Sequence, residues 1–276
     1  MFNPFENPFT ADSKKAKKSL LAKVRNVLIS DKNAEKNIEA AIKAVPYGPY
    51  EILPTELEFF YDLEDQLIKD SGFLHRIKNR DQAKKKILEL MKQSQAPALE
   101  FDENGRIITL IIDNTECLKK IPASIVRLRN LHKLSMCNNK IESIPSNIDY
   151  IKHLQNIVLY ANKIKSIPEG IYRLSELTDL NLFENKISEL SDKIKNLKRL
   201  DVLWLGKNRL TKLPESLSEL NLLLLFAADN LLTSIPRDLD KMPRLKQLNL
   251  ALNKLSTAEK NKIKKMFAGR SIDLDI

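Results

Sequence analysis

A segment of about 23 residues recurs along this chain, and no other feature constrains its fold as strongly. Successive copies begin at Leu131, Leu154, Leu177 and Leu200 and share the spacing L-x-x-L-x-L-x-x-N-x-L. A period of this length is typical of a solenoid, in which stacked copies bury a face that no copy could bury alone. The chain should therefore be elongated and expose a large surface.

The Leu-x-Leu part of each copy predicts a short strand, because side chains in a strand alternate between two faces. Stacking the copies then pairs the strands into a curved parallel sheet. An Ile-Pro or Leu-Pro pair follows in most copies and suits a return loop, since proline lacks a backbone donor; one copy has Leu190–Ser191 instead. The segment after it is expected to be 3-10 or irregular. The predicted inward pairs are Leu110/Ile112, Leu134/Met136, Ile157/Leu159, Leu180/Leu182, Leu203/Leu205 and Leu225/Ala227.

This pattern resembles the leucine-rich repeat family, in its short bacterial-type form of about 22–23 residues. The resemblance covers about residues 100–276. It implies an α/β fold: a leucine-rich repeat solenoid with a curved parallel sheet, in which strands and α or 3-10 segments form a right-handed superhelix. We assign about six to seven repeats to residues 98–255, with starts near Ile107, Leu131, Leu154, Leu177, Leu200, Leu222 and Leu245.

An asparagine closes the strand part of most copies, where the chain turns inward. A buried turn leaves backbone groups that need partners, and the amide offers both donors and an acceptor. We therefore predict a structural Asn ladder that holds the turns and binds no ligand. Its members are Asn139, Asn162, Asn185, Asn208, Asn230 and Asn253.

Two copies depart from the common spacing. The copy that begins at Leu200 is one residue short, so the next copy is expected to start at Leu222. The first copy has Thr115 at the Asn position, and Leu118 falls one residue late. Because a slip of one residue exchanges the two faces of a strand, this first copy is the hardest to align.

Both ends of the solenoid need caps over the exposed core. Residues 256–276 predict a helix-strand cap, with a capping box at Ser256 and Glu259 and an edge strand over residues 272–276. Residues 98–107 predict a hairpin that turns at Asn104–Gly105 and leads into the first repeat.

Residues 11–97 lack the repeat and predict an α-helical region. Its second helix is expected to run as far as Val45, the third to start in a capping box of Thr55 and Glu58, and the fourth to start at Asp81. This region could form a small bundle, lie over the first coil as an N-terminal cap, or stand as a separate domain. Residues 1–10 are predicted to be a flexible tail. The tail holds two Asn-Pro-Phe tripeptides, which resemble the ligand motif of the EH domain.

The formal net charge is +10, but basic residues are interleaved with acidic ones. Nucleic-acid binding would need a focused basic stripe beside aromatic residues, so we predict no nucleic-acid partner. Cys117 and Cys137 are predicted to be reduced thiols. No transmembrane stretch or signal peptide is recognisable, so we expect a cytoplasmic protein unless a non-standard export route exists.

The sequence contains no nucleophile elbow, phosphate loop or metal-ligand spacing. We therefore predict no enzyme, no cofactor and no metal site. His75, His132 and His153 are expected to be surface or packing residues, although His132 could face the concave side. Cys137 is expected to project from the concave end of its strand without a close polarising neighbour.

Residues between the inward leucines form columns on the concave face, outside the core. The middle column contains Trp204, the only tryptophan of the chain. Large exposed apolar patches usually mark interaction sites, and aromatic residues are their usual anchors. The predicted partner-binding residues are Val158, Tyr160, Asp179, Asn181, Phe183, Val202, Trp204, Leu224 and Phe226, with Lys207 and Gln247 completing a polar rim.

The sequence therefore favours a non-enzymatic adaptor that binds a partner protein or peptide on its concave sheet. One alternative is a self-associating scaffold, such as a homodimer, that uses the same patch. Others are a purely structural patch, a host-interacting effector, or an EH-domain ligand that acts through the tail. A repeat fold does not fix a function, so the partner's identity is left open.

Overall fold

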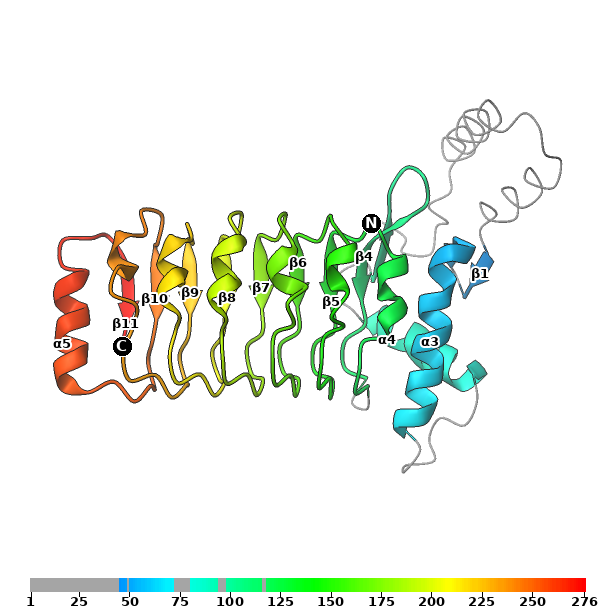
Figure 1. Ribbon diagram of the computed structural model, residues 1–276. Helices are drawn as coiled ribbons and strands as arrows, with labels where there is room; N and C mark the ends of the chain where they lie inside the picture. Colours follow the sequence, from blue (N-terminus) through cyan, green and yellow to red (C-terminus); the bar gives the residue numbers. More distant parts are fainter. Residues whose placement is uncertain (1–44, 49, 72–79, 94–97, 116–117) are drawn as a thin grey trace.

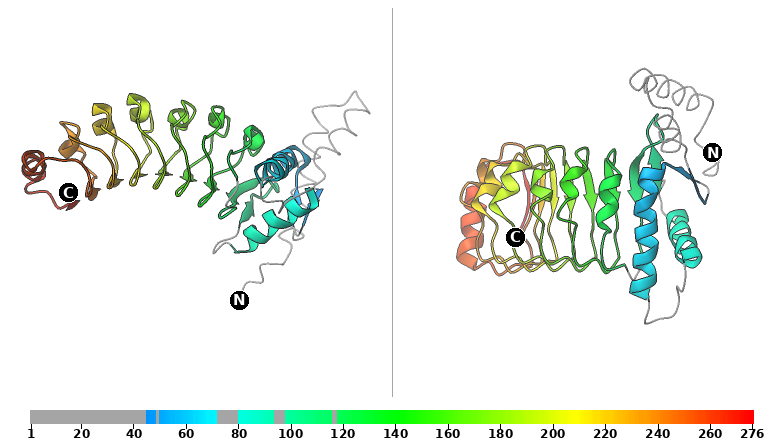
Figure 2. Two further views of the ribbon diagram at one scale, coloured as in Figure 1. Left: turned by 90° about the horizontal axis from the view of Figure 1, so that it is seen from below. Right: turned by 45° about the vertical axis from the view of Figure 1, so that its right-hand side comes forward.

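The computed structural model describes residues 45–48, 50–71, 80–93, 98–115 and 118–276. They form a curved solenoid, with strands along its inner side and 3-10 turns along its outer side (Figure 1, Figure 2). The main sheet is parallel from β4 to β11, and β3 pairs antiparallel with β4. The predicted leucine-rich repeat type of α/β solenoid is thereby confirmed. The strands are β3 (Leu99–Phe101), β4 (Ile107–Ile111), β5 (Lys133–Ser135), β6 (Asn156–Val158), β7 (Asp179–Asn181), β8 (Val202–Trp204), β9 (Leu224–Phe226), β10 (Gln247–Asn249) and β11 (Asp273–Asp275).

The apolar core runs along the inside of the coils. Every inward pair that the alternation predicts, from Leu110/Ile112 to Leu225/Ala227, is fully buried. Each return segment contributes further apolar side chains from a single 3-10 turn, because the coil is too short for a crossover helix. These turns are η1 (Ala123–Arg127), η2 (Ile148–Tyr150), η3 (Ile171–Arg173), η4 (Asp192–Asn196), η5 (Glu215–Glu219) and η6 (Leu239–Lys241).

Each ladder asparagine joins its own coil to the one before it. Asn185 is typical: its Oδ1 accepts from the N–H of Ile164 in the preceding coil at 2.9 Å. Its Nδ2 donates to the carbonyl oxygens of Leu159 in the preceding coil and Leu182 in its own, at 3.0 and 3.1 Å. The same bonds recur at Asn162, Asn208, Asn230 and Asn253.

Thr115 replaces the asparagine in the first coil and relays the same bonds. Its Oγ1 accepts from the N–H of Leu118 at 3.2 Å. Both its N–H and its hydroxyl donate to Oδ1 of Asn139. Because the hydroxyl accepts this bond, the Leu118 N–H has a partner although this coil contains one extra residue.

The residue before each ladder position has a left-handed backbone. Its φ lies between 50° and 61° in each of these coils, and none of these residues is glycine. The conformation turns the chain from the strand toward the core, and L-residues adopt it at some cost. The residues are Asn114, Asn138, Ala161, Glu184, Lys207, Asp229 and Leu252.

The short coil absorbs its missing residue on the outer side. After the other 3-10 turns, ψ lies between 62° at Leu128 and 108° at Met242, whereas after η5 it is 165° at Leu220. This extended residue reaches Leu222 directly, and Leu225 then pairs with Leu203 in the common register. Leu222 therefore stands in its coil where Leu200 stands in the coil before it.

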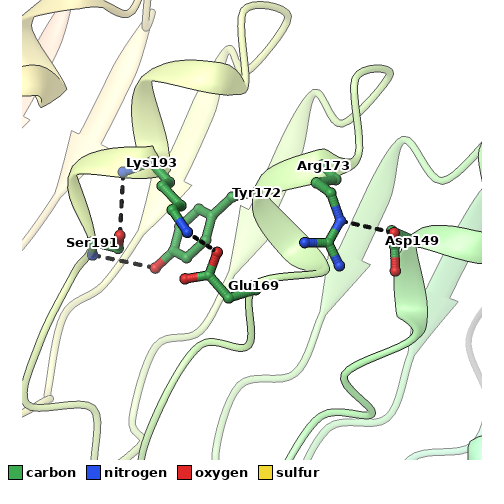
Figure 3. A network of polar contacts seen from close by, with 6 residues as sticks. All are labelled: Asp149, Glu169, Tyr172, Arg173, Ser191 and Lys193. Atoms are coloured by element: carbon green, nitrogen blue, oxygen red, sulfur yellow. Dashed lines mark hydrogen bonds and ion pairs between the residues drawn. The ribbon is translucent and has the colours of Figure 1, made fainter.

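Polar contacts on the outer side also link one coil to the next (Figure 3). Arg173 donates to Asp149 at 2.9 Å, and Lys193 pairs with Glu169. Ser191, which stands where the other copies have proline, donates its backbone N–H to the hydroxyl of Tyr172 at 3.3 Å. Serine in place of proline therefore adds a backbone N–H donor, and this donor has a partner.

The N-terminal part of the structure begins with a small antiparallel hairpin of β1 (Val45–Tyr47) and β2 (Tyr50–Ile52), followed by α3 (Pro54–Ser71) and α4 (Arg80–Gln93). The prediction that a helix includes Val45 is wrong. The next residue is Pro46, and a residue that precedes proline favours an extended backbone.

The capping box predicted at Thr55 and Glu58 is also wrong. The helix α3 begins at Pro54, whose fixed φ suits the first helical position, so Thr55 lies inside the first turn. Glu58 instead forms an ion pair with Arg127 of η1 at 2.7 Å. Helix α3 therefore packs on the first outer turn of the solenoid.

A buried carboxylate also connects α3 to the sheet. Both oxygens of Glu56 lie within 3.4 Å of the backbone nitrogen of Ile107, the first residue of β4. Burial raises the pKa of Glu56 to about 7. Nearby, the hydroxyl of Tyr47 donates to Glu64 at 2.7 Å.

The predicted structures at both sheet ends are present. β3 and β4 form the hairpin, with Gly105 in its turn at φ 74°. At the other end, α5 (Thr257–Met266) begins with the hydroxyl of Ser256 accepting from the N–H of Glu259 at 3.1 Å. The strand β11 then pairs with β10 in parallel.

Several predictions concern residues outside the described part of the chain. These are the Asn-Pro-Phe tail, the helices expected before Val45, Cys117 and His75. Among the described residues, no helix has the length and apolar character needed to cross a membrane.

Candidate partner-binding face

The strand register places the predicted face residues in lateral rows. Asn181 of β7 lies beside Trp204 of β8, and Trp204 lies beside Phe226 of β9. One row along, Asp179 and Val202 are neighbours in the same way. Every residue of the predicted set is half-buried and lies on β6–β9 or just after β6 and β7.

The centre of the face is a parallel aromatic stack. The rings of Trp204 and Phe226 lie 4.1 Å apart between centroids, with an interplanar angle of 3°. A residue pair directly across adjacent strands stands close enough for such contact. Each ring covers one face of the other, and both side chains remain partly open to solvent.

Phe183 lies beside this stack because Gly206 leaves room for it. A Cβ on Gly206 would come within 2.9 Å of the Phe183 ring. The ammonium group of Lys207 lies 5.4 Å from the centroid of the same ring and also pairs with Glu184 at 3.4 Å. The sequence marked Phe183 and Lys207, but it gave no reason to single out Gly206.

Tyr160 contacts the preceding coil, whereas Phe183 belongs to the following coil. Its hydroxyl accepts from the side chain of Asn138 in the coil before it, at 3.2 Å. Among the described residues, no ring contact joins Tyr160 to Phe183. The aromatic centre of the face therefore consists of Phe183, Trp204 and Phe226, with Val158 and Tyr160 at its margin.

Asp179 is an acidic residue beside this aromatic centre. It is half-buried beside Val202, and burial raises its pKa. In the described part of the chain, its carboxylate has no hydrogen-bond or ion-pair partner. By contrast, Asp201 at the start of β8 pairs with Arg244 at 2.8 Å.

The prediction that Cys137 projects from the face is wrong. Its side chain is 1% exposed, and its thiol lies 3.4 Å from the hydroxyl of Ser135. Asp113 of the preceding coil accepts from the Cys137 N–H at 2.6 Å and from the Ser135 hydroxyl at 2.9 Å, which closes this corner. Burial raises the pKa of the thiol to about 12, the reverse of what a nucleophilic cysteine needs.

The two described histidines adjacent to the sheet contact each other. The rings of His132 and His153 stack with centroids 5.9 Å apart, and His153 lies 3.4 Å from a carboxylate oxygen of Glu176. Among the described residues, no group of three metal-ligating side chains is arranged to hold a metal ion.

Comparison with known families gives the identity of the coils. The family described as Leucine rich repeat matches residues 129–187 and 152–210. The matched coils contain Asn139, Asn162, Asn185 and Asn208 of the Asn ladder. Residues 129–210 are leucine-rich repeats. A search of curated protein sequences gave no match.

Solved leucine-rich repeat structures resemble the solenoid. The leucine-rich repeat ectodomain of the plant membrane receptor kinase GASSHO1/SCHENGEN3 from Arabidopsis thaliana, in complex with CASPARIAN STRIP INTEGRITY FACTOR 2, is 27% identical with a TM-score of 0.50. The match covers 54% of this chain but only 19% of that one. A plant ice-binding protein, 21% identical, has a TM-score of 0.53 over 73% of this chain and 72% of its own, and this likeness concerns the fold alone.

Proposed function

We propose that this protein is a non-enzymatic binding module that holds a partner protein or peptide on its concave sheet. The parallel stack of Trp204 and Phe226 carries the proposal. A half-exposed aromatic pair on a stiff sheet can bury apolar area on binding at little conformational cost. Aromatic residues in such positions supply much of the binding energy of interfaces.

Two further observations support this function. Solenoids bind through extended inner surfaces, and the related Arabidopsis ectodomain was solved in complex with CASPARIAN STRIP INTEGRITY FACTOR 2. The Asn ladder also ties each coil of the aromatic centre to the coils before and after it. We further propose a cytoplasmic setting, which agrees with the free, buried thiol of Cys137.

The test is affinity capture with the wild type and three variants of the full chain, followed by direct titration of the captured protein. Trp204→Ala and Phe226→Ala should each lose the partner, with affinity reduced at least tenfold. Tyr150→Ala is the matched control, because Tyr150 is an aromatic residue of η2 on the outer side and is 66% exposed. It should retain the partner.

Circular dichroism and thermal melting separate binding from folding. All three variants should melt close to the wild type, because none of the substituted side chains is fully buried. A large fall in the melting temperature of Trp204→Ala would assign the stack a structural role. Sedimentation velocity addresses self-association: a dimer that dissociates in Trp204→Ala would make a second copy of the chain the partner.

A further inference from the structure

One face of the Trp204 ring stacks on Phe226; the other, here called the open face, has no ring of the described residues stacked on it. Phe226 covers the side toward β9. On the side toward β7, its register neighbour is Asn181, whose Oδ1 accepts from the N–H of Phe183 at 3.1 Å. This bond turns the Asn181 amide back onto its own strand. Among the described residues, no second ring stacks on Trp204 from that side.

An unpaired carboxylate stands next to the open face. Asp179 lies two residues before Asn181 on the same face of β7, so it is a diagonal neighbour of Trp204. Diagonal cross-strand neighbours lie about 7–8 Å apart, within reach of a long side chain. A half-buried carboxylate without a partner is unfavourable, and burial raises its pKa accordingly.

The charge around the stack is opposite to that of the whole chain. The chain has a formal net charge of +10. On β7–β9 and beside these strands lie four acidic side chains: Asp179, Glu184, Asp201 and Asp229. Lys207 pairs with Glu184, and Arg244 pairs with Asp201. Among the described residues, Asp179 and Asp229 have no ion-pair partner.

We propose that this face binds an arginine side chain of a basic partner segment, with the guanidinium stacked on the open side of Trp204 and paired with Asp179. This inference rests on the proposed function and adds the chemistry of the partner. Arginine fits better than lysine because its planar group stacks on aromatic rings and donates two parallel hydrogen bonds to a carboxylate. The stack Phe226–Trp204 would then gain a third, cationic layer.

The first experiment selects peptides on the full chain. A random peptide display library is enriched on the wild type, and peptides that still bind Trp204→Ala are discarded. The remaining pool should be enriched in arginine next to an apolar residue. Selection on Asp179→Asn should lose the arginine enrichment.

The second experiment measures one enriched peptide and its citrulline analogue, which has the same shape without the charge. Trp204 is the only tryptophan of the chain, so its fluorescence reports binding at this site directly. The arginine peptide should bind the wild type at least tenfold more tightly than the analogue. In Asp179→Asn this ratio should fall below about twofold.

Asp201→Asn is the matched control, because it removes the same charge from the residue before β8. The carboxylate of Asp201 is already paired with Arg244. The Asp201→Asn variant should preserve the tenfold ratio. An equal loss in both variants would mean that the negative charge of the region as a whole, and no specific contact with Asp179, causes the arginine preference. That result would overturn the inference. Trp204-dependent peptides without arginine would overturn it as well, yet leave the proposed function intact. Failure to select any Trp204-dependent peptide would contradict both.

Discussion

At the scale of single residues, the ladder asparagines hold neighbouring coils together. Each is buried or half-buried and satisfies backbone groups from two coils at once. The chemistry follows from geometry, because a short amide at the turn has the required acceptor on one atom and donors on the other.

Asn185→Ala should therefore destabilise the protein by about 2 kcal/mol, because it leaves the buried Ile164 N–H without a partner. It also removes one of the two amide donors from the carbonyl oxygens of Leu159 and Leu182. Urea denaturation followed by circular dichroism measures the loss. Asn253→Ala is the control, because Asn253 is only half-buried and lies in the last coil. Its cost should be clearly smaller; equal costs would contradict the account.

The left-handed residues offer a stabilising substitution. Leu252 has φ 56° and is 78% exposed, so its side chain gains little from packing. Asparagine tolerates this conformation better than leucine, and Leu252→Asn should raise the free energy of unfolding by about 0.5–1 kcal/mol. Leu231→Asn, at an exposed leucine outside the positive-φ set, should give no gain. A comparable gain there would point to solubility instead of backbone strain.

At the scale of elements, each coil has an inner side of constant strand register and an outer side that tolerates variation. Strand register is identical in every coil from β4 to β10, whereas the outer segments vary in length and in their hydrogen-bond donors. Ser191 is an example of this tolerance, because the hydroxyl of Tyr172 accepts the bond that proline would have removed.

A double-mutant cycle tests this pair. Tyr172→Phe should cost about 1 kcal/mol, because it leaves the Ser191 N–H without its partner. Ser191→Pro removes that donor, so the Tyr172→Phe substitution should cost much less in the Ser191→Pro background. Melting of the four proteins gives the coupling energy. Additive effects would mean that the 3.3 Å contact contributes nothing to stability.

The sequence predicted the periodic elements well and the unique ones poorly. Inward leucines, the short coil at Leu222 and the Ser256 cap could be recognised because repetition or a local motif specifies them. Val45 and Thr55 were misassigned because helical periodicity competed with the backbone restrictions of Pro46 and Pro54. These restrictions act on the neighbouring backbone and leave no periodic signal.

The partner face could be predicted only in part, for a related reason. Alternation identified Trp204 and Phe226 as outward-facing residues, but their stacking geometry depends on the sheet's spacing. The burial of Cys137 depends on Asp113, a residue of the preceding coil. Contacts between coils of this kind have no counterpart in the pattern of a single repeat.

At the scale of the whole molecule, we propose that the described residues between 45 and 93 act as a cap that protects the first coil. The contacts of Glu58 with Arg127 and of Glu56 with Ile107 tie α3 to the solenoid. The aromatic centre lies several strands away on β7–β9, so the cap and the proposed binding face can be perturbed separately.

The buried Glu56 makes the attachment of the cap depend on pH. Its pKa is about 7 in the folded protein against an ordinary value of 4.5, so the protonated carboxyl is the favoured form. Its contribution to stability is complete below pH 4.5, falls as pH rises from 4.5 to 7, and stays low above that. The difference is at most about 3 kcal/mol.

Urea midpoints at pH 5 and pH 8, compared among variants, isolate this effect. Glu56→Gln should show a smaller loss between the two pH values than the wild type, because the amide cannot ionise. Glu58→Gln, an exposed change on the same helix, should behave like the wild type. A Glu56→Gln profile parallel to that of the wild type would contradict the role of Glu56.

The short coil after Leu220 has a wider consequence. One residue is missing on the outer side, yet the strands on the inner side keep their alignment. Length changes in the outer loops therefore leave the pattern of exposed side chains on the sheet unaltered. The face grows or shrinks only by whole coils, in steps of about 4.8 Å. A chain built in this way can lengthen its contact with a partner while every existing contact remains in place.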